Sequence, residues 1–294
     1  MLVSGALSLT PSAAGGVWYG DRGCWFGGRT SVKNNTIDYV TISTTGNAID
    51  FGDLSVIVWG ASACSNSTRG VIDISSASSN ELEYVTFSTT GNATSFGNST
   101  APSKVDKGSC SDGSRGVFGG GFTNTNVIDY ITISTIGDAI DFGDLTQSRH
   151  AIGACSDGTK GLFGGGSTGV GVNTIDYITI ATTGNAIDFG DLTRSNNYAH
   201  SCSSSVRGIW AGGEPNTNTI DYVTIATTGN ATDFGDLVSA RNACGLCSNG
   251  TRGLIGGGAS SNVIEYVTID TTGNTTDFGD LTLGRRQLAS ASGD

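Results

Sequence analysis

Several kinds of residue are scarce in this sequence. Among 294 residues there are three prolines, one methionine and two histidines, and charged residues make up only 14%. Disordered chains usually carry more charge, so this composition favours a folded chain. The only histidines are His150 and His200, and the sequence has no serine elbow, phosphate-binding loop or HExxH helix. We therefore expect a protein that is not an enzyme, with no catalytic residues and no cofactor.

Long hydrophobic runs are also absent. The longest uninterrupted apolar stretch runs from Val56 to Trp59, whereas a membrane-spanning helix needs about 20 apolar residues. Residues 1–16 are mildly apolar but carry no Lys or Arg ahead of their apolar part. We therefore expect neither membrane insertion nor a secretory signal peptide.

Positive charge is limited and dispersed. The chain has 15 Lys and Arg residues against 26 Asp and Glu residues, which gives a formal net charge of −11. A chain of this charge repels phosphate backbones, and its basic residues are scattered instead of gathered in one run. Nucleic acid is therefore not an expected partner.

The seven cysteines follow a pattern that argues against disulfides. Five of them occupy the same place in successive segments of the chain, namely Cys64, Cys110, Cys155, Cys202 and Cys247. Equivalent sites of neighbouring repeats are not expected within the roughly 7 Å that a disulfide allows between Cα atoms. Cys244 and Cys247 form a C-x-x-C pair, but no second pair or histidine lies nearby. Buried free thiols are the favoured interpretation, and they suit folding in a reducing cytoplasm.

The main feature that the sequence does contain is a motif repeated six times. Its central tyrosine recurs every 44 to 47 residues, at Tyr39, Tyr84, Tyr130, Tyr177, Tyr222 and Tyr266. A period in the forties without a helical pattern is typical of a β-propeller with one four-stranded blade per repeat. We predict an all-β fold, a six-bladed β-propeller of four-stranded antiparallel blades.

One repeat, residues 148–192, shows the expected parts of a blade. The first strand reads SRHAIGAC, and the Asp157-Gly158 pair that follows it suits a type I′ hairpin. The second strand ends in consecutive glycines, the third carries Tyr177 and the fourth carries Phe189. A sheet of this kind has two apolar faces, which stacking around an axis would bury.

The two ends of the repeat array predict how the ring closes. Residues 281–294 align without a gap on residues 145–158, so that Arg285 matches Arg149 and Ala291 matches Cys155. We predict that a strand at residues 285–292 completes the first blade and leaves no open sheet edge. The propeller then spans residues 21–294, and residues 1–20 form an N-terminal arm or docking segment.

Acidic residues recur in columns along the repeats. Calcium prefers six to eight oxygen ligands, and weak candidates for holding it are Asp50, Asp53, Asp141, Asp144, Asp188 and Asp191. The favoured alternative is structural: the acidic columns cap turns and form exposed ion pairs worth about 0 to 1 kcal/mol each. Their expected partners are Lys104, Arg149, Arg241 and Arg285. A second basic column is expected to brace the first hairpin, and it comprises Arg22, Arg69, Arg115, Lys160, Arg207 and Arg252.

Aromatic residues that depart from the repeat are the candidates for a binding face. They are Trp18, Tyr19, Trp59 and Trp210. Exposed aromatic rings stack on sugars and anchor protein partners. The alternative is that most of these rings fill the core.

The order of parts resembles the kelch repeat: an early Arg, a strand ending in Gly-Gly, a strand with Tyr and a strand with an aromatic residue. Kelch propellers typically have Trp at the last position, where this chain has Phe51, Phe96, Phe142, Phe189, Phe234 and Phe278. The wording DYVTIATTGNATDFGDL at residues 221–237 also resembles repeats of virion structural proteins of bacteriophages, especially phages of marine cyanobacteria.

The second resemblance implies a function. It suggests a non-enzymatic structural protein of the virion, displayed on a tail, fibre or surface appendage and assembled in the host cytoplasm. Expected partners are other virion proteins, in an assembly with multiple copies, and host-surface glycans during attachment. The alternative is a bacterial extracellular or cell-surface propeller that binds carbohydrate as a lectin does. A virion protein should co-purify with particles, whereas a lectin should reach the envelope.

Overall fold

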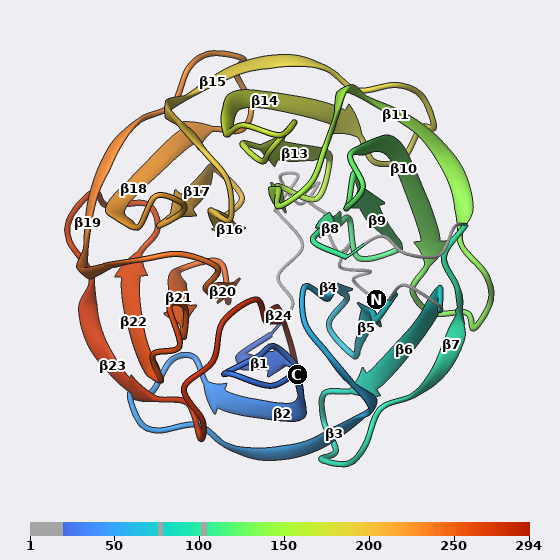
Figure 1. Cartoon of the computed structure of the whole chain (residues 1–294), viewed down its shortest axis with the longest axis vertical. Coiled ribbons are helices and arrows are strands. Elements are labelled where there is room, and N and C mark those ends of the chain that lie inside the picture. The colour runs from blue at the N-terminus through green and yellow to red at the C-terminus, as the bar shows by residue number, and fades with distance from the viewer. Residues whose placement is uncertain (1–19, 76–78, 101–104) are drawn as a thin grey trace, which may run out of the picture.

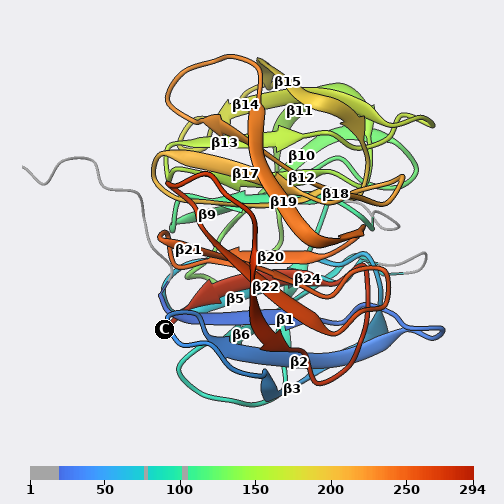
Figure 2. The ribbon, with the colours of Figure 1, turned by 90° about the vertical axis from the view of Figure 1, so that its left-hand side faces the viewer.

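The computed structural model describes residues 20–75, 79–100 and 105–294, and it confirms the predicted architecture. Six four-stranded antiparallel sheets surround a central axis as the blades of a β-propeller (Figure 1). Figure 2 shows the same ring from the side. Among the described residues there is no helix long and apolar enough to span a membrane.

Each blade runs from an inner strand at the axis to an outer strand at the rim. Blade one contains β24 (Ala289–Gly293), β1 (Arg22–Phe26), β2 (Asn34–Thr41) and β3 (Ile49–Val58). Blade two contains β4 (Ser62–Ser65), β5 (Arg69–Asp73), β6 (Glu81–Thr86) and β7 (Thr94–Asn98). Blade three contains β8 (Gly108–Ser111), β9 (Arg115–Gly119), β10 (Thr125–Thr132) and β11 (Ile140–Arg149).

The remaining blades repeat this order. Blade four contains β12 (Gly153–Ser156), β13 (Lys160–Gly164), β14 (Val172–Thr179) and β15 (Ile187–Asn196). Blade five contains β16 (His200–Ser203), β17 (Arg207–Ala211), β18 (Thr217–Thr224) and β19 (Thr232–Arg241). Blade six contains β20 (Gly245–Ser248), β21 (Arg252–Gly256), β22 (Val263–Thr268) and β23 (Thr276–Asp280).

The C-terminal strand closes the ring, as predicted. β24 pairs antiparallel with β1, and Ala291 lies opposite Cys24. The strand begins at Ala289 instead of Arg285 because Gln287 has a φ of +54° and turns the chain before the strand starts. The N-terminal arm expected at residues 1–20 lies outside the described residues except for Gly20.

Two local predictions differ from the structure. In blade four, Ser148 and Arg149 end the outer strand of the preceding blade, and the inner strand starts at Gly153. Ala151, with a φ of +56°, turns the chain between them. The hairpin at Asp157-Gly158 has positive φ only at Gly158, which is typical of a type II′ turn instead of type I′.

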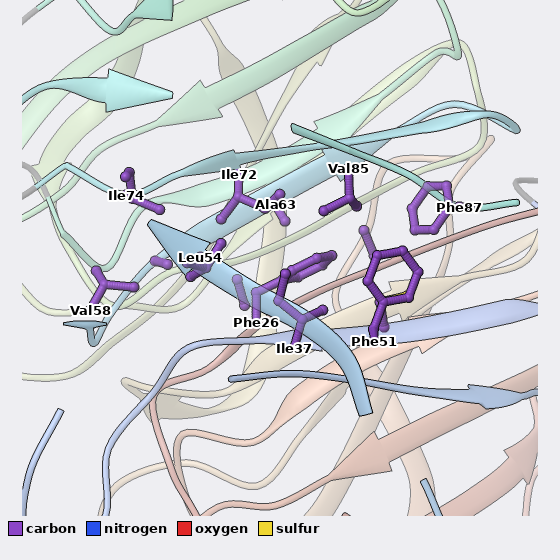
Figure 3. Packing of buried hydrophobic residues seen from close by; sticks show 14 residues of the cluster. Phe26, Ile37, Phe51, Leu54, Val58, Ala63, Ile72, Ile74, Val85 and Phe87 are labelled. Carbon is purple, nitrogen blue, oxygen red and sulfur yellow. The ribbon is translucent and has the colours of Figure 1, made fainter. Parts of the chain in front are cut away.

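The hydrophobic core lies between the blades. In Figure 3, Phe26 and Leu54 of blade one point toward Ile72 and Val85 of blade two, and all four side chains are buried. Five similar clusters occupy the other interfaces. Full burial of a large apolar side chain contributes roughly 1.5 to 3 kcal/mol, so stacking of the blades is the main source of stability.

The repeated cysteines pack at these interfaces. A Cβ atom added at Gly208 of blade five would lie 2.6 Å from Sγ of Cys155 in blade four, so the thiol occupies the space above the glycine. The same arrangement joins Cys64 to Gly116, Cys110 to Gly161, Cys202 to Gly253 and Cys247 to Gly23. All seven cysteines are free and buried, and burial raises the pKa of the Cys155 thiol well above its ordinary value.

The most repetitive part of the sequence is a latch between neighbouring blades. Gly184 N–H donates to the Phe142 carbonyl over 2.8 Å, and Ala186 N–H donates to the Asp144 carbonyl over 2.8 Å. In return, Asp144 N–H donates to Oδ1 of Asn185 over 3.1 Å. Equivalent bonds join all six interfaces. The recurring TTGN and DFGD motifs are therefore explained by hydrogen bonds between blades.

Candidate functional site

The aspartates considered for calcium lie on the outer strands. Three of them are exposed, namely Asp50, Asp141 and Asp188. The other three directly follow the glycine of the FG pair in the same strand, and they are Asp53, Asp144 and Asp191. Within residues 20–75, 79–100 and 105–294, no three His, Cys, Asp or Glu side chains come close enough together to hold a metal ion. The structure therefore does not gather these six side chains into one site.

The acidic residue before each repeat tyrosine has a different environment from the one expected. Arg149 Nη2 lies 2.8 Å from Asp176 Oδ2, and neither side chain is exposed to solvent. The guanidinium also donates to the carbonyls of Gly165, Thr174 and Phe163. Equivalent buried pairs are Arg241 with Glu265 and Arg285 with Asp38.

The expectation of exposed ion pairs is therefore wrong for these three. The alignment of the repeats gives the basic and acidic columns, but it does not show that each arginine reaches into the next blade and is buried there. Removing one partner of a buried pair typically destabilises a protein by about 3 to 5 kcal/mol, because the other charge stays buried and uncompensated. These pairs therefore stabilise the contact between neighbouring blades.

At the other three interfaces a different residue stands at the position of the arginine. Val58 and Asn196 occupy the equivalent positions before blades two and five, and Lys104 lies outside the described residues. Before blade three, Lys107 contributes the charge, with Nζ 2.6 Å from Asp73 Oδ2 and 3.8 Å from Asp129 Oδ2.

The second basic column contacts the first hairpin through its backbone and the next blade through its side chains. The Arg207 guanidinium lies 4.5 Å from the centre of the Tyr222 ring, and Nη1 donates to the carbonyl of Ile269 in the next blade. Each column member lies over the tyrosine of its own blade. The expected bracing of the hairpin comes from the backbone: the N–H of Arg207 donates to Oγ of Ser204 over 3.0 Å, and four other members make the equivalent bond. The side-chain contact with the next blade was not predicted.

The aromatic candidates separate into different environments. Trp210 is 2% exposed, and its indole N–H donates to the Gly153 carbonyl over 3.2 Å, so it packs between two blades and reaches no outer face. Trp59 is partly exposed, with the Arg29 guanidinium 4.9 Å from the ring centre. Trp18 and Tyr19 lie outside the described residues.

Near one end of the axis, a ring of serine hydroxyls joins all six inner strands. Each hydroxyl donates to the serine carbonyl of the preceding blade, over distances from 2.6 to 2.9 Å. The members are Ser65, Ser111, Ser156, Ser203, Ser248 and Ser292. The circle is complete only because β24 brings Ser292 into place.

A second ring, made of backbone, lies where the inner strands begin. Each N–H donates to the carbonyl of the equivalent residue in the preceding blade, over 2.6 to 3.0 Å. All six members have positive φ, and they are Gly60, Asp106, Ala151, Tyr198, Ala243 and Gln287. Positive φ is uncommon outside glycine, so five of these residues hold a costly conformation.

A cavity of about 50 Å³ lies between the two rings. It is lined by His200, Ser201 and Lys107, among others. Burial lowers the pKa of His200 to about 4, so the imidazole is neutral at pH 7. The volume exceeds the roughly 10 to 15 Å³ that one ordered water needs. The cavity has room for a few waters and is well below the roughly 300 Å³ of typical small-molecule sites.

His150 lies outside the cavity and uses its ring in a local contact. Its Nδ1 is 2.6 Å from Oδ1 of Asn124, and burial lowers its pKa. The two histidines therefore do not form a shared site.

The most varied chemistry around the axis belongs to the side chains of the backbone ring. Tyr198 Oη lies 3.2 Å from Oδ2 of Asp106, and Gln287 Nε2 lies 3.5 Å from Oδ1 of Asp106. Burial raises the pKa of Asp106 to about 6, while the hydrogen bonds from Tyr198 and Gln287 and the charge of Arg29 act in the opposite direction. Small and polar residues alternate around this ring, which is the signal that could have identified the cluster from the sequence.

The geometry thus favours one end of the axis, with Arg29, Trp59, Asp106, Tyr198 and Gln287, as the candidate binding site. Comparison with known proteins adds no family to this description: no protein-family model matches the chain, and no curated protein sequence matches it.

Proposed function

We propose that this chain is a non-catalytic structural protein of a bacteriophage particle. In this proposal the propeller is displayed on a tail, fibre or surface appendage. There it assembles with other virion proteins and contributes to attachment at the host surface. The chain is assembled in the host cytoplasm, where reducing conditions keep its seven thiols free.

The observation that carries the proposal is the use of the repeated residues. The latch, the buried ion pairs and the stacked arginines all join one blade to the next. Such a ring suits a rigid body that presents a surface, because its repeated chemistry is committed to holding shape. By contrast, the side chains of the backbone ring differ from blade to blade, so a partner could recognise them individually.

The sequence resemblances support the same proposal. The order of parts in each blade resembles kelch repeats, with Phe in place of the usual Trp, and this resemblance supports the fold, since kelch propellers serve many tasks. The wording at residues 221–237 resembles repeats of virion proteins from phages of marine cyanobacteria.

Purified particles provide the test. We expect the chain to co-purify with virions through a density gradient at a fixed ratio to the major capsid protein, and to occupy a defined place in a cryo-EM map. A soluble host enzyme, followed through the same gradient, controls for carry-over. A chain that leaves the particle fraction together with that enzyme would contradict the proposal.

A second candidate is a bacterial surface lectin. The partly exposed Trp59 beside Arg29 favours it, since aromatic rings stack on sugars. In that case the chain would appear in the envelope fraction of cells that carry no phage.

A further inference from the structure

Three basic residues lie side by side at the end of the axis where the backbone ring lies. Arg29, in the loop after β1, exchanges hydrogen bonds with Arg286, in the segment before β24, over 2.9 Å in each direction. Arg29 also bridges Lys33 in the antiparallel sense. Residues directly opposite each other in antiparallel bridges project their side chains to the same side. Arg286, Arg29 and Lys33 therefore form a row, which we call the basic row.

No carboxylate of the described residues forms an ion pair with the basic row, although the charge of Arg29 partly offsets the burial that raises the pKa of the nearby Asp106. Among the described residues, ion pairs are formed only by Lys107, Arg149, Arg241 and Arg285. Like charges placed opposite each other destabilise a strand pair, and the protein as a whole carries a net charge of −11. A row of cations without a direct ion pair, in an acidic protein, points to an anionic ligand. Arg29 and Arg286 are partly exposed and Lys33 is exposed, so the ligand can reach them.

Two neighbours add features of a sugar site. The Trp59 ring lies beside the Arg29 guanidinium, and aromatic rings bind the apolar faces of sugars. Gln287, adjacent to Arg286, is 4% exposed, and its Oε1 is buried without a hydrogen-bond partner. Unsatisfied buried acceptors are uncommon in folded proteins. A sugar hydroxyl would supply the missing donor.

We propose that the basic row, Trp59 and Gln287 bind an acidic sugar unit of a host-surface polysaccharide, with its carboxylate on the guanidinium groups of Arg29 and Arg286. Arginine suits this task because its planar fork matches a carboxylate with two parallel hydrogen bonds. The proposal rests on the attachment role given above and specifies its ligand.

Asp106 gives the proposed site a dependence on pH. It faces Arg29, Tyr198 and Gln287, and Glu214 also acts on Tyr198. Above a pH of about 6 the Asp106 carboxylate is ionised and competes with the ligand for Arg29. Below that pH it is neutral, while a sugar carboxylate stays ionised. Binding should therefore strengthen as the pH falls from 7 to 5.

The test is calorimetric titration of the full chain with tri-galacturonate, with sulfated maltotriose and maltotriose as comparison ligands. We expect tri-galacturonate to bind best and maltotriose not to bind measurably. Arg286→Gln should weaken binding at least tenfold, and Arg286→Lys should recover only part of the loss. Arg194→Gln is the matched control, because Arg194 donates to Thr217 away from the basic row. Asp106→Asn should remove the pH dependence.

Three results would overturn the inference: equal binding of tri-galacturonate and maltotriose, stronger binding of the sulfated sugar, or unchanged binding by Arg286→Gln. If Arg286→Gln does not fold, Trp59→Ala provides the same test, with an expected loss of at least fivefold. The gradient experiment separates this inference from the proposed function. A chain that belongs to the particle but binds no acidic sugar defeats only the ligand, whereas a chain that binds the sugar but is missing from particles defeats the virion role.

Discussion

The blade interfaces and the backbone ring at the axis use the same sixfold arrangement in opposite ways. At the interfaces the Gly and Asx residues of the latch recur in every blade and make the same hydrogen bonds. Around the axis, the backbone bonds recur but the side chains change from Gly60 to Asp106, Tyr198 and Gln287. Repetition in this chain therefore marks contacts that hold the ring, whereas departures from repetition mark positions free to acquire a specific chemistry.

The largest effect on the ring is expected from deleting residues 285–294. The deletion removes β24, the pair between Arg285 and Asp38, and one member of each ring. The loss should rival the entire 5 to 15 kcal/mol that stabilises typical domains. We expect loss of the cooperative thermal transition measured by circular dichroism. An unchanged melting temperature would argue against closure by the C-terminal strand.

Breaking one buried ion pair should have the next largest effect. Asp176→Asn leaves the Arg149 charge buried without its partner and should lower the free energy of unfolding by about 3 to 5 kcal/mol in urea titrations. The double variant Arg149→Met with Asp176→Leu should recover most of the loss. Asp188→Asn, on an exposed carboxylate of the same blade, is the control and should change stability by less than about 0.5 kcal/mol. Equal effects of the two Asn substitutions would show that depth of burial is unimportant.

The titration of Asp106 should be visible in stability. Because its pKa in the folded protein is raised from 3.8 to about 6, folding favours the protonated carboxyl. The associated stability is fully present below pH 3.8 and is lost as the pH rises to about 6. The shift corresponds to a loss of roughly 3 kcal/mol. Asp106→Asn should flatten the stability profile between pH 4 and pH 7. A wild-type profile already flat across that window would contradict the assignment.

The smallest effect is expected within the latch itself. A Cβ at Gly143, where φ is +148°, would lie 2.4 Å from the Gly184 carbonyl oxygen, so Gly143→Ala should cost about 1 to 3 kcal/mol. Gly137→Ala is the matched control, because nothing lies within 4 Å of a Cβ at that position. Thermal melts of the two variants provide the measurement, and similar melting temperatures would show that the latch tolerates a side chain.

The fold could be predicted because the sequence repeats once per blade. The spacing of the tyrosines gave the number of blades, and the alignment of Arg285 with Arg149 identified the closing segment. The start of the inner strands was missed because Ala151 and Gln287 adopt positive φ without being glycine. Nothing in their residue types announces that conformation.

The candidate site was harder to predict, since it depends on closure in three dimensions. Arg29 and Arg286 lie near opposite ends of the sequence and meet only because β24 joins β1. The burial of Arg149 with Asp176 was missed for a related reason, as Arg149 ends a strand of blade three and is buried against backbone carbonyls of blade four. Trp59 was identified from the sequence as a candidate, but its basic neighbours were not.

The bonds between β24 and β1 also have a topological consequence. Every junction from an outer strand to the next inner strand has one residue of positive φ and the same backbone hydrogen bond. The six junctions are therefore equivalent in this respect. Joining Asp294 to Gly20 through a short linker and cutting the chain at another junction should yield a circular permutant with the same blades in the same order around the axis.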